Sequence, residues 1–352
     1  MKKRIALVLA LMLLGTSVLA GCKKDAAPEG DVAQNTNTSV NPDAPAITVK
    51  APDLTTTEYD NTDIVEIDGK VYSAAMFRCM LGQVADSIGG TDTQVWVDNT
   101  IETLKDWTSL DTLCADYGVY LQDSDYEEIY NLRTQTIEQY DSVDAYYADL
   151  EMYHMTDAVY VENIKQNVLF TKFAEVFVSD FVADEQDILA YVNDQYVRVK
   201  HILVKTDGLD DSQKAEARSR AERVLERAKA GESFETLVEE ISEDGMDVDL
   251  GYYFTYGKMV EPFETASFAL EVNEISEIVE SQFGYHIIKK YPMEKEHILA
   301  DTEIMDTAKS YLCNEAYIAA SQEAMNKAIV TYYDNYEEVK NAIVEEILAA
   351  KK

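Results

Sequence analysis

Positive charge is scarce in this chain of 352 residues. Lys and Arg number 30 against 66 Asp and Glu, which gives a formal net charge of −36. Nucleic-acid binding needs basic side chains that neutralise phosphates, and peripheral docking on anionic lipid needs them too. The charge therefore argues against nucleic acid as a partner and against a purely electrostatic attachment to membranes. An acidic surface mainly favours solubility and, less strongly, basic partners.

Cysteine is also rare, and its spacing carries no metal or redox motif. Besides Cys22 the chain has Cys79, Cys114 and Cys313, which show neither a CxxC pattern nor the spacing of zinc ligands. We expect buried free thiols in helices, since unpaired cysteine behaves as a small apolar residue. The sequence implies no metal and no cofactor.

Proline and glycine are missing from long stretches. No proline occurs between Asp53 and Glu261, and no glycine occurs between Val119 and Asp207. Because both residues interrupt helices, the first half of the chain is expected to be helical. Helices are predicted near 92–117, 124–148, 154–180 and 184–194. After residue 298, apolar residues at three- and four-residue spacing predict further helices that pack on the earlier ones.

Long apolar runs are absent after the N-terminus. Ile5 to Leu14 is apolar but shorter than the ~20 residues of a spanning helix, and Lys2, Lys3 and Arg4 precede it. Small residues and then "LAGC", ending at Cys22, follow. This order predicts a signal peptide at 1–21 and resembles the lipobox of bacterial lipoprotein precursors. The resemblance implies lipidation of Cys22; the alternative is an ordinary secretion signal with a chance cysteine.

A tether follows the proposed lipidation site. Residues 22–58 hold four of the six prolines, with Asn, Thr, Asp and Ala in most other positions. Such a segment cannot bury enough apolar surface to fold. We therefore expect a protein that stands outside the cytoplasm, anchored by lipid to the bacterial cell membrane. About 290 residues remain, enough for two domains.

The first folded segment is predicted to be a hairpin followed by a helix. "IVEI" and "KVY" flank Asp68-Gly69, a strong two-residue turn, and Ser73 is placed to cap the next helix. Tyrosine is abundant, and eight of the 23 lie between residues 119 and 160. They suit either interhelical packing or a groove for unfolded polypeptide.

Residues 197–292 differ from the helical segments in composition, because they contain turn residues and runs rich in strand-forming residues. "VRVKHILVK" predicts a strand, and two helices follow, one expected to be capped by Ser212 and the other by Ser233. A short strand, a helix with Pro262 in its first turn, and the strands "EISEIVES" and "FGYHIIKKY" complete the order β-α-α-β-α-β-β. The fold class is α+β, with a small antiparallel sheet.

Several motifs of this segment resemble one family. "KHILVK", "AGESFETLVEEIS", "DLGYYFTYGKMVEPFETASFAL" and "SQFGYHIIK" occur in the order and with the spacing of parvulin-type peptidyl-prolyl cis/trans isomerases. The resemblance covers roughly 95 residues. It implies a parvulin-like sheet with surrounding helices, inserted in a mostly helical, discontinuous chaperone-like domain. The expected division is a helical domain at 59–195, the isomerase domain at 196–293, and C-terminal helices at 294–352 that pack on the first domain.

The family's functional positions can be transferred to this sequence residue by residue. The resemblance implies four catalytic candidates, which are His201, Asp244, Ser281 and His286. It also implies four substrate-binding candidates around a proline pocket, which are Leu250, Met259, Phe263 and Phe283. One departure concerns the loop from Asp244 to Leu250, because the family usually has glycine where this chain has Val248.

The residue types fit isomerisation of X–Pro bonds. Rotation about this bond breaks amide resonance, so an enzyme must bind the twisted amide better than either planar form. An apolar socket that includes Met259 and Phe263 would hold the proline ring away from water. His201 and His286 would hydrogen-bond each other, either taking part in the chemistry or only supporting the site. Zinc binding is not expected of two histidines and one aspartate without further ligands.

The layout of lipobox, helical domain, isomerase segment and helical tail also resembles PrsA-type foldase lipoproteins. That resemblance implies isomerisation of X–Pro bonds in newly exported polypeptides, with the helical domain holding unfolded clients and forming a homodimer. One alternative is a non-catalytic holdase with an inactive isomerase segment. Another is a solute-binding lipoprotein, which requires a two-lobed α/β architecture.

Overall fold

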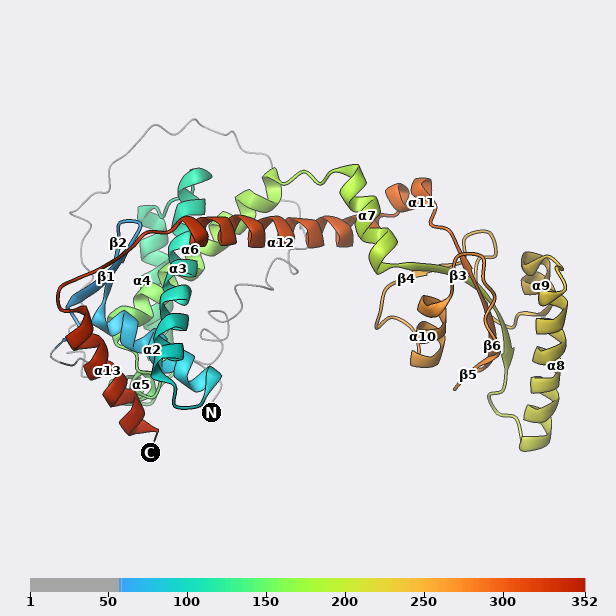
Figure 1. The fold of residues 1–352 in the computed structure, drawn as a ribbon, viewed down its shortest axis with the longest axis horizontal. Helices are drawn as coiled ribbons and strands as arrows, with labels where there is room; N and C mark the ends of the chain where they lie inside the picture. Colours follow the sequence, from blue (N-terminus) through green and yellow to red (C-terminus); the bar gives the residue numbers. More distant parts are fainter. Residues whose placement is uncertain (1–56, 58, 352) are drawn as a thin grey trace. The chain divides into compact units, whose positions relative to one another are not determined.

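The computed structural model describes Thr57 and residues 59–351. The expected signal peptide at 1–21, Cys22 and the tether at 22–58, apart from Thr57, lie outside the described residues. The chain divides into two compact units (Figure 1). One contains the chain up to Val182 together with Cys313–Lys352, and the other is Ala183–Leu312. Among the described residues, no helix has the length and apolar character needed to cross a bilayer.

The first unit contains a three-stranded antiparallel sheet in the order β2-β1-β7. Strands β1 (Asp63–Ile67) and β2 (Lys70–Ser73) form the predicted hairpin, and both turn residues have positive φ. Ser73 caps α2 (Ala74–Ile88) by accepting a hydrogen bond from the Met76 amide, as predicted. The third strand, β7 (Val330–Tyr332), pairs with β1 and was not predicted.

The remaining helices of this unit surround the sheet and α2. They are α3 (Thr93–Asp116), α4 (Asp123–Ile137), α5 (Val143–Glu151), α6 (Asp157–Asp180), α13 (Tyr336–Ala350) and, from Cys313 onward, α12 (Thr302–Lys327). The single helix predicted at 124–148 is wrong. The helix breaks at 138–142 because Ser142 accepts a hydrogen bond from the Ala145 amide and starts α5.

One hydrophobic core joins the two ends of this unit. Phe77 of α2, Trp96 of α3, Tyr146 of α5 and Ile343 of α13 belong to the same buried cluster. Of the eight tyrosines between 119 and 160, only Tyr120 is exposed, so most of them serve helix packing. The three thiols at 79, 114 and 313 are buried and free, as expected.

The second unit contains the predicted β-α-α-β-α-β-β order. Its elements are β3 (Val197–Lys205), α8 (Asp211–Lys229), α9 (Phe234–Ile241), β4 (Tyr252–Phe254), α10 (Glu261–Ala269), β5 (Val279–Ser281) and β6 (Gly284–Tyr291). It also includes α7 (Glu185–Gln195), α11 (Lys295–Ala300) and the beginning of α12 (Thr302–Lys327). It is therefore longer than the isomerase domain expected at 196–293.

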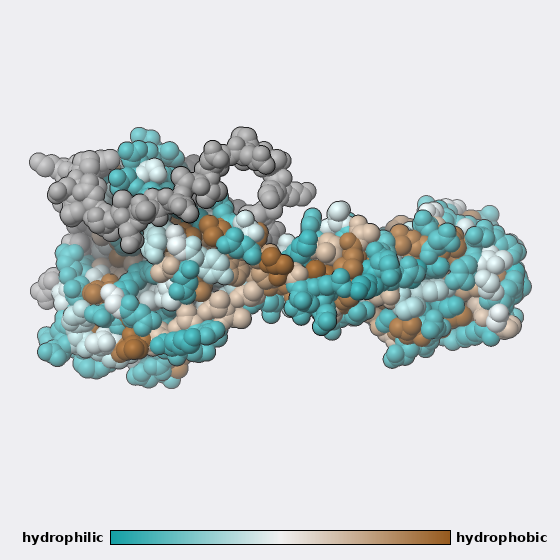
Figure 2. Space-filling view, turned by 90° about the horizontal axis from the view of Figure 1, so that it is seen from above, coloured by the Kyte–Doolittle hydropathy of each residue, from teal (hydrophilic) through white to brown (hydrophobic). Residues whose placement is uncertain are grey.

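The four strands of this unit form one antiparallel sheet in the order β4-β3-β6-β5. Ile202 and Ile287 pack towards α8 and α9 on one face, while Val199 and Ile288 pack towards Phe263 of α10 on the other. The sheets that the structure describes are antiparallel, which does not fit the two-lobed α/β architecture of a solute-binding lipoprotein. Figure 2 shows a largely hydrophilic surface with scattered apolar patches.

Two local predictions in this unit need correction. Asp210, not Ser212, caps α8, because Asp210 and Gln213 form a reciprocal capping box of side-chain and main-chain hydrogen bonds. The strand expected over "EISEIVES" is ordered as β5 only in its last three residues, preceded by a single bridge from Ile275 to Lys289.

Candidate active site

The two histidines of the sheet lie on neighbouring strands, on the face that α10 covers. In the β3–β6 ladder, Leu203 lies opposite His286 and His201 lies opposite Ile288. Since residues two apart on a strand point to the same face, His201 and His286 are diagonal neighbours. Their Nδ1 atoms are 3.1 Å apart, and each residue is only 4% exposed.

A chain of hydrogen bonds extends from the histidine pair in both directions. His201 Nε2 lies 2.9 Å from Asp244 Oδ2, and His286 Nε2 lies 2.7 Å from Ser281 Oγ. The structure thus brings together all four residues expected to be catalytic. It also adds Tyr252, whose hydroxyl donates to the same Asp244 oxygen at 2.7 Å.

The protonation states follow from burial and from these contacts. Burial lowers the pKa of His201, although the neighbouring Asp244 opposes the shift. Burial and the adjacent His201 lower the pKa of His286 to about 4. For Asp244, burial alone would raise the pKa, but hydrogen bonds from Tyr252 and His201 outweigh it and the net shift is downward. At neutral pH the two imidazoles are therefore neutral and the carboxyl is ionised.

These protonation states fix the donor and the acceptor of every hydrogen bond from Asp244 to Ser281. The ionised Asp244 can only accept, so His201 must carry its proton on Nε2. The Nδ1 atom of His201 then accepts a hydrogen bond from the protonated Nδ1 of His286. His286 Nε2 is left to accept from the Ser281 hydroxyl, whose oxygen accepts from the Phe283 amide at 3.1 Å. A single ionised carboxyl thus sets both tautomers and the orientation of the Ser281 hydroxyl at the other end of the network.

Of the apolar candidates, Phe263 directly contacts the two histidines. The Phe263 ring makes edge contacts with both imidazoles, with centroids 5.0 Å from His201 and 5.2 Å from His286. Met259 is half-buried in the same cluster as Phe263, and Phe283 is 48% exposed next to Ser281. Leu250 is half-buried, and its carbonyl accepts from the Arg198 guanidinium at 2.9 Å.

The loop that departs from the family still delivers Asp244 to His201. Asp247 Oδ1 accepts from the amides of Asp249 and Leu250, which forms a compact turn. Val248 packs against the core between the sheet and α9, and it is not among the residues with positive φ. Glycine is required one turn later, at Gly251, where φ is +77° and a Cβ would lie 2.6 Å from the Val199 carbonyl oxygen.

Tyr252 is the member of the site that sequence reasoning missed. It stands eight residues after Asp244, across a loop, and no local pattern connects the two. Burial and its bond to Asp244 raise the pKa of Tyr252 to about 12, so it remains a donor. Within the described chain, no cluster of three or more His, Cys, Asp or Glu side chains could hold a metal ion.

The chain is similar to known proteins over most of its length. Residues 187–291 match the family model described as "PPIC-type PPIASE domain". The chain is 25% identical over 342 residues to "Foldase protein PrsA" of Caldanaerobacter subterraneus subsp. tengcongensis, covering 95% of this chain and 94% of that protein. It is 31% identical to the protein of the same name from Bacillus subtilis over 171 residues, covering 48% of this chain and 54% of that protein.

Solved structures of such proteins also match. The crystal structure of PrsA from Bacillus subtilis is 25% identical and covers 76% of this chain and 91% of that chain, with a TM-score of 0.26. Residues 187–291 are a parvulin-type peptidyl-prolyl isomerase domain, and the chain belongs with the PrsA foldases.

Proposed function

We propose that this chain is a lipid-anchored, extracytoplasmic foldase. Its second unit would catalyse cis/trans isomerisation of X–Pro bonds in exported polypeptides. Its helical unit, which is the first unit with the chain up to Val182 and Cys313–Lys352, would hold unfolded clients as a chaperone. The observation that carries the catalytic part is the directed hydrogen-bond chain from Asp244 to Ser281 beside Phe263.

Exposure divides the site into groups that can reach a client and groups that cannot. The side chain of Asp244 is 26% exposed, and Ser281 and Met259 are partly exposed. The side chain of His201 is 5% exposed, which leaves no room for contact with a peptide. We therefore give His201 and His286 a positioning role, and we give Asp244 and Ser281 the contacts with the client amide.

The proposed mechanism uses electrostatics and water exclusion, because no covalent bond changes. The planar amide is stabilised by resonance that places partial negative charge on its oxygen, and the rotation barrier is ~18–20 kcal/mol. A fixed carboxylate at Asp244 would disfavour that charge-separated form and so favour the twisted amide. Met259 would contact the proline ring, with the buried Phe263 packed behind it, while Phe283 and Leu250 would flank the ring.

An isomerisation assay on a short Ala-Pro peptide tests this function. A protease-free fluorescence or NMR exchange readout avoids cleavage of the enzyme. Wild type is expected to accelerate exchange, and Met259→Ala is expected to weaken substrate binding. Undetectable acceleration by a folded wild-type protein would instead leave a holdase with an inactive isomerase unit.

Anchoring depends on Cys22 and has its own test. The motif before Cys22, with its charged and apolar segments, supports lipidation there. In a bacterial host, the wild-type protein should fractionate with membranes and Cys22→Ser should be released or left unprocessed. Labelled fatty acid should be incorporated by the wild type and not by Cys22→Ser, and equal incorporation by the two would contradict a lipid anchor at this residue.

A further inference from the structure

Strand β7 ends the sheet of the first unit, and among the described residues no strand pairs with its outer edge. Two hydrogen bonds, from Tyr333 N to the Ile64 oxygen and from Asp68 N to the Ile329 oxygen, fix the ladder with β1. Antiparallel ladders alternate between residues that bond inward and residues that bond outward. The N–H and C=O groups of Val330 and Tyr332 therefore point away from β1, as donors and acceptors for another strand.

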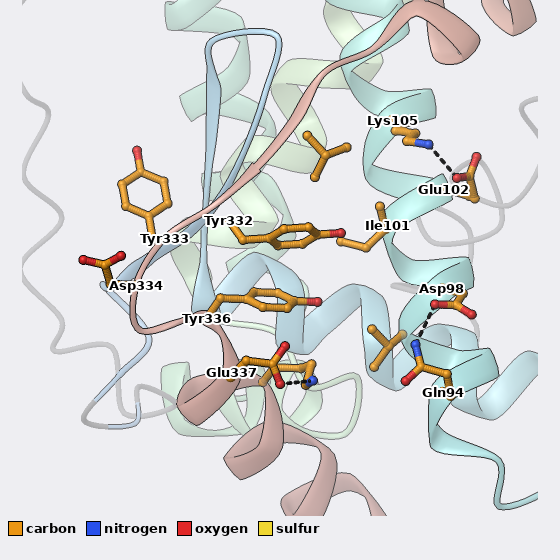
Figure 3. A pocket seen from close by; sticks show the side chains of 13 residues that line it. Gln94, Asp98, Ile101, Glu102, Lys105, Tyr332, Tyr333, Asp334, Tyr336 and Glu337 are labelled. Carbon is orange, nitrogen blue, oxygen red and sulfur yellow. Dashed lines mark hydrogen bonds and ion pairs between the residues drawn. The ribbon is translucent and has the colours of Figure 1, made fainter.

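A cavity of about 610 Å³ lies next to this edge, bounded by α3, β7 and the start of α13 (Figure 3). Val97 and Ile101 of α3 and Val330 of β7 give it apolar walls. The rings of Tyr332 and Tyr336 point towards α3, with centroids 4.3 Å apart, and Tyr332 is 49% exposed. The cavity thus combines free main-chain groups with apolar and aromatic surface.

The rim of this cavity is acidic. The lining includes the carboxylates of Asp98, Glu102, Asp334 and Glu337 and the ammonium groups of Lys105 and Lys340. Both lysines are already paired, at 2.7 Å from Glu102 and from Glu337 respectively. Four carboxylates against two lysines leave an excess of two negative charges. Natural edge strands are usually protected by lysine, and this edge instead faces carboxylates.

We propose that the β7 edge and its cavity form a docking site for a basic, extended segment of an unfolded polypeptide. The segment would pair with the outward groups of Val330 and Tyr332 as an added strand. Its lysine or arginine side chains would lie near Asp98 and Asp334, and its apolar side chains would fill the cavity. This inference rests on the proposed holding of clients by the helical unit, and it assigns that activity a place and a preferred chemistry.

Binding of a defined peptide tests the proposal on the full chain. The probe is a fluorescein-labelled, proline-free octapeptide of alternating lysine and valine, titrated by fluorescence anisotropy; the glutamate–valine octapeptide is its control. We expect the glutamate peptide to bind at least about tenfold more weakly than the lysine peptide. Added salt should weaken binding of the lysine peptide. Equal affinity for the two peptides would overturn the proposal.

Val330→Pro isolates the strand pairing, because it removes one outward N–H and leaves the bonds from Tyr333 N to the Ile64 oxygen and from Asp68 N to the Ile329 oxygen. Val330→Pro should lower the affinity for the lysine peptide about fivefold. Val330→Ala, which keeps the N–H, should change that affinity less than about twofold. Equal effects of the two substitutions would exclude strand addition. If Val330→Pro unfolds, the double variant Asp98→Asn, Asp334→Asn tests the proposal instead. Unchanged affinity of this variant for the lysine peptide would overturn the proposal.

Two further measurements separate this proposal from the wider function. Val330→Pro should also suppress aggregation of an unfolded client less well, while its isomerase activity stays at the wild-type level. Full suppression despite lost peptide binding would show that clients are held elsewhere and would overturn the proposal. A dimeric wild type that becomes monomeric in Val330→Pro would assign the edge to a second copy of the chain, which also overturns it.

Discussion

A single hydrogen bond joins the Nδ1 atoms of His201 and His286, which lie 3.1 Å apart on two neighbouring antiparallel strands. The bond requires the two rings to differ, since one Nδ1 must donate and the other must accept. The ionised Asp244 at the far side of His201 decides which ring is which. The pair is therefore a relay of orientation from a carboxyl to the Ser281 hydroxyl.

Histidine tautomers provide the first prediction. His201 is expected as the Nε2–H tautomer and His286 as the Nδ1–H tautomer. His286 should remain neutral down to about pH 4, because burial and the adjacent His201 lower its pKa. Long-range ¹H–¹⁵N correlation spectra of the four histidines read both the tautomers and the titrations. The opposite pair of tautomers, or a charged His286 at pH 6, would contradict the directed chain.

Removing the charge at Asp244 should slow isomerisation without changing the shape of the site. Asp244→Asn keeps the volume but replaces a carboxylate with an amide, so kcat/KM is expected to fall about 10- to 100-fold. Asp247→Asn is a matched control, because it makes the same chemical change in the same loop on a side chain that only caps the turn. Comparable losses in both variants would mean that loop structure, not the charge at Asp244, limits the rate.

Tyr252 should set the acid limit of activity. Its hydroxyl is the largest of the influences that lower the pKa of Asp244, so Tyr252→Phe raises that pKa. A carboxyl with a lowered pKa stays ionised down to a lower pH. The contribution of its charge to isomerisation is lost as the pH falls through that pKa. The acid limb of kcat/KM should therefore move to higher pH in Tyr252→Phe.

The neighbouring tyrosine provides the control for this shift. Tyr253 pairs with Arg198 in the β3–β4 ladder and points to the opposite face of the sheet. Tyr253→Phe removes an identical hydroxyl one residue away and should leave the pH profile in place. Coincident profiles for wild type and both variants would show that Asp244 does not depend on Tyr252.

The sequence predicted that His201 and His286 would be neighbours because both residues carry local signals. The strand "VRVKHILVK" and the sequence "SQFGYHIIK" each place one histidine within an apolar strand, and pairing of the two strands brings the histidines together. Asp244 and Ser281 were identified through the family motifs. Tyr252 was missed because its role depends on a loop conformation that brings it back to Asp244, and a one-dimensional pattern does not contain that information.

The first unit was less predictable for a related reason. Strand β7 has only three residues, and Tyr332 pairs with Val65, 267 positions earlier. So short a strand is stabilised by its long-range partner and not by its own propensity, and helical periodicity dominates on both sides of it. The break between α4 and α5 contains neither glycine nor proline, and its one local signal is the Ser142 side chain that caps the start of α5.

Gly284 should control the stability of the sheet that carries the site. Its φ is +142°, and a Cβ there would lie 2.2 Å from the Val204 carbonyl oxygen on the neighbouring strand. Gly284→Ala must therefore shift β6 against β3, at a cost of about 2–4 kcal/mol. Gly257→Ala also places alanine at a positive φ, but no heavy atom lies within 4 Å, so about 1 kcal/mol is expected.

The two units can be followed separately in one sample. Both tryptophans of the chain, Trp96 and Trp107, lie on α3, so their fluorescence reports the first unit alone. Urea-dependent proteolysis between residues 197 and 291 reports the second. Gly284→Ala should lower the urea midpoint of the second unit well below that of Gly257→Ala, while the tryptophan transition stays in place. Equal midpoints in the two variants would mean that the β3–β6 ladder tolerates a Cβ at this position, and the close strand approach would not be what selects glycine there.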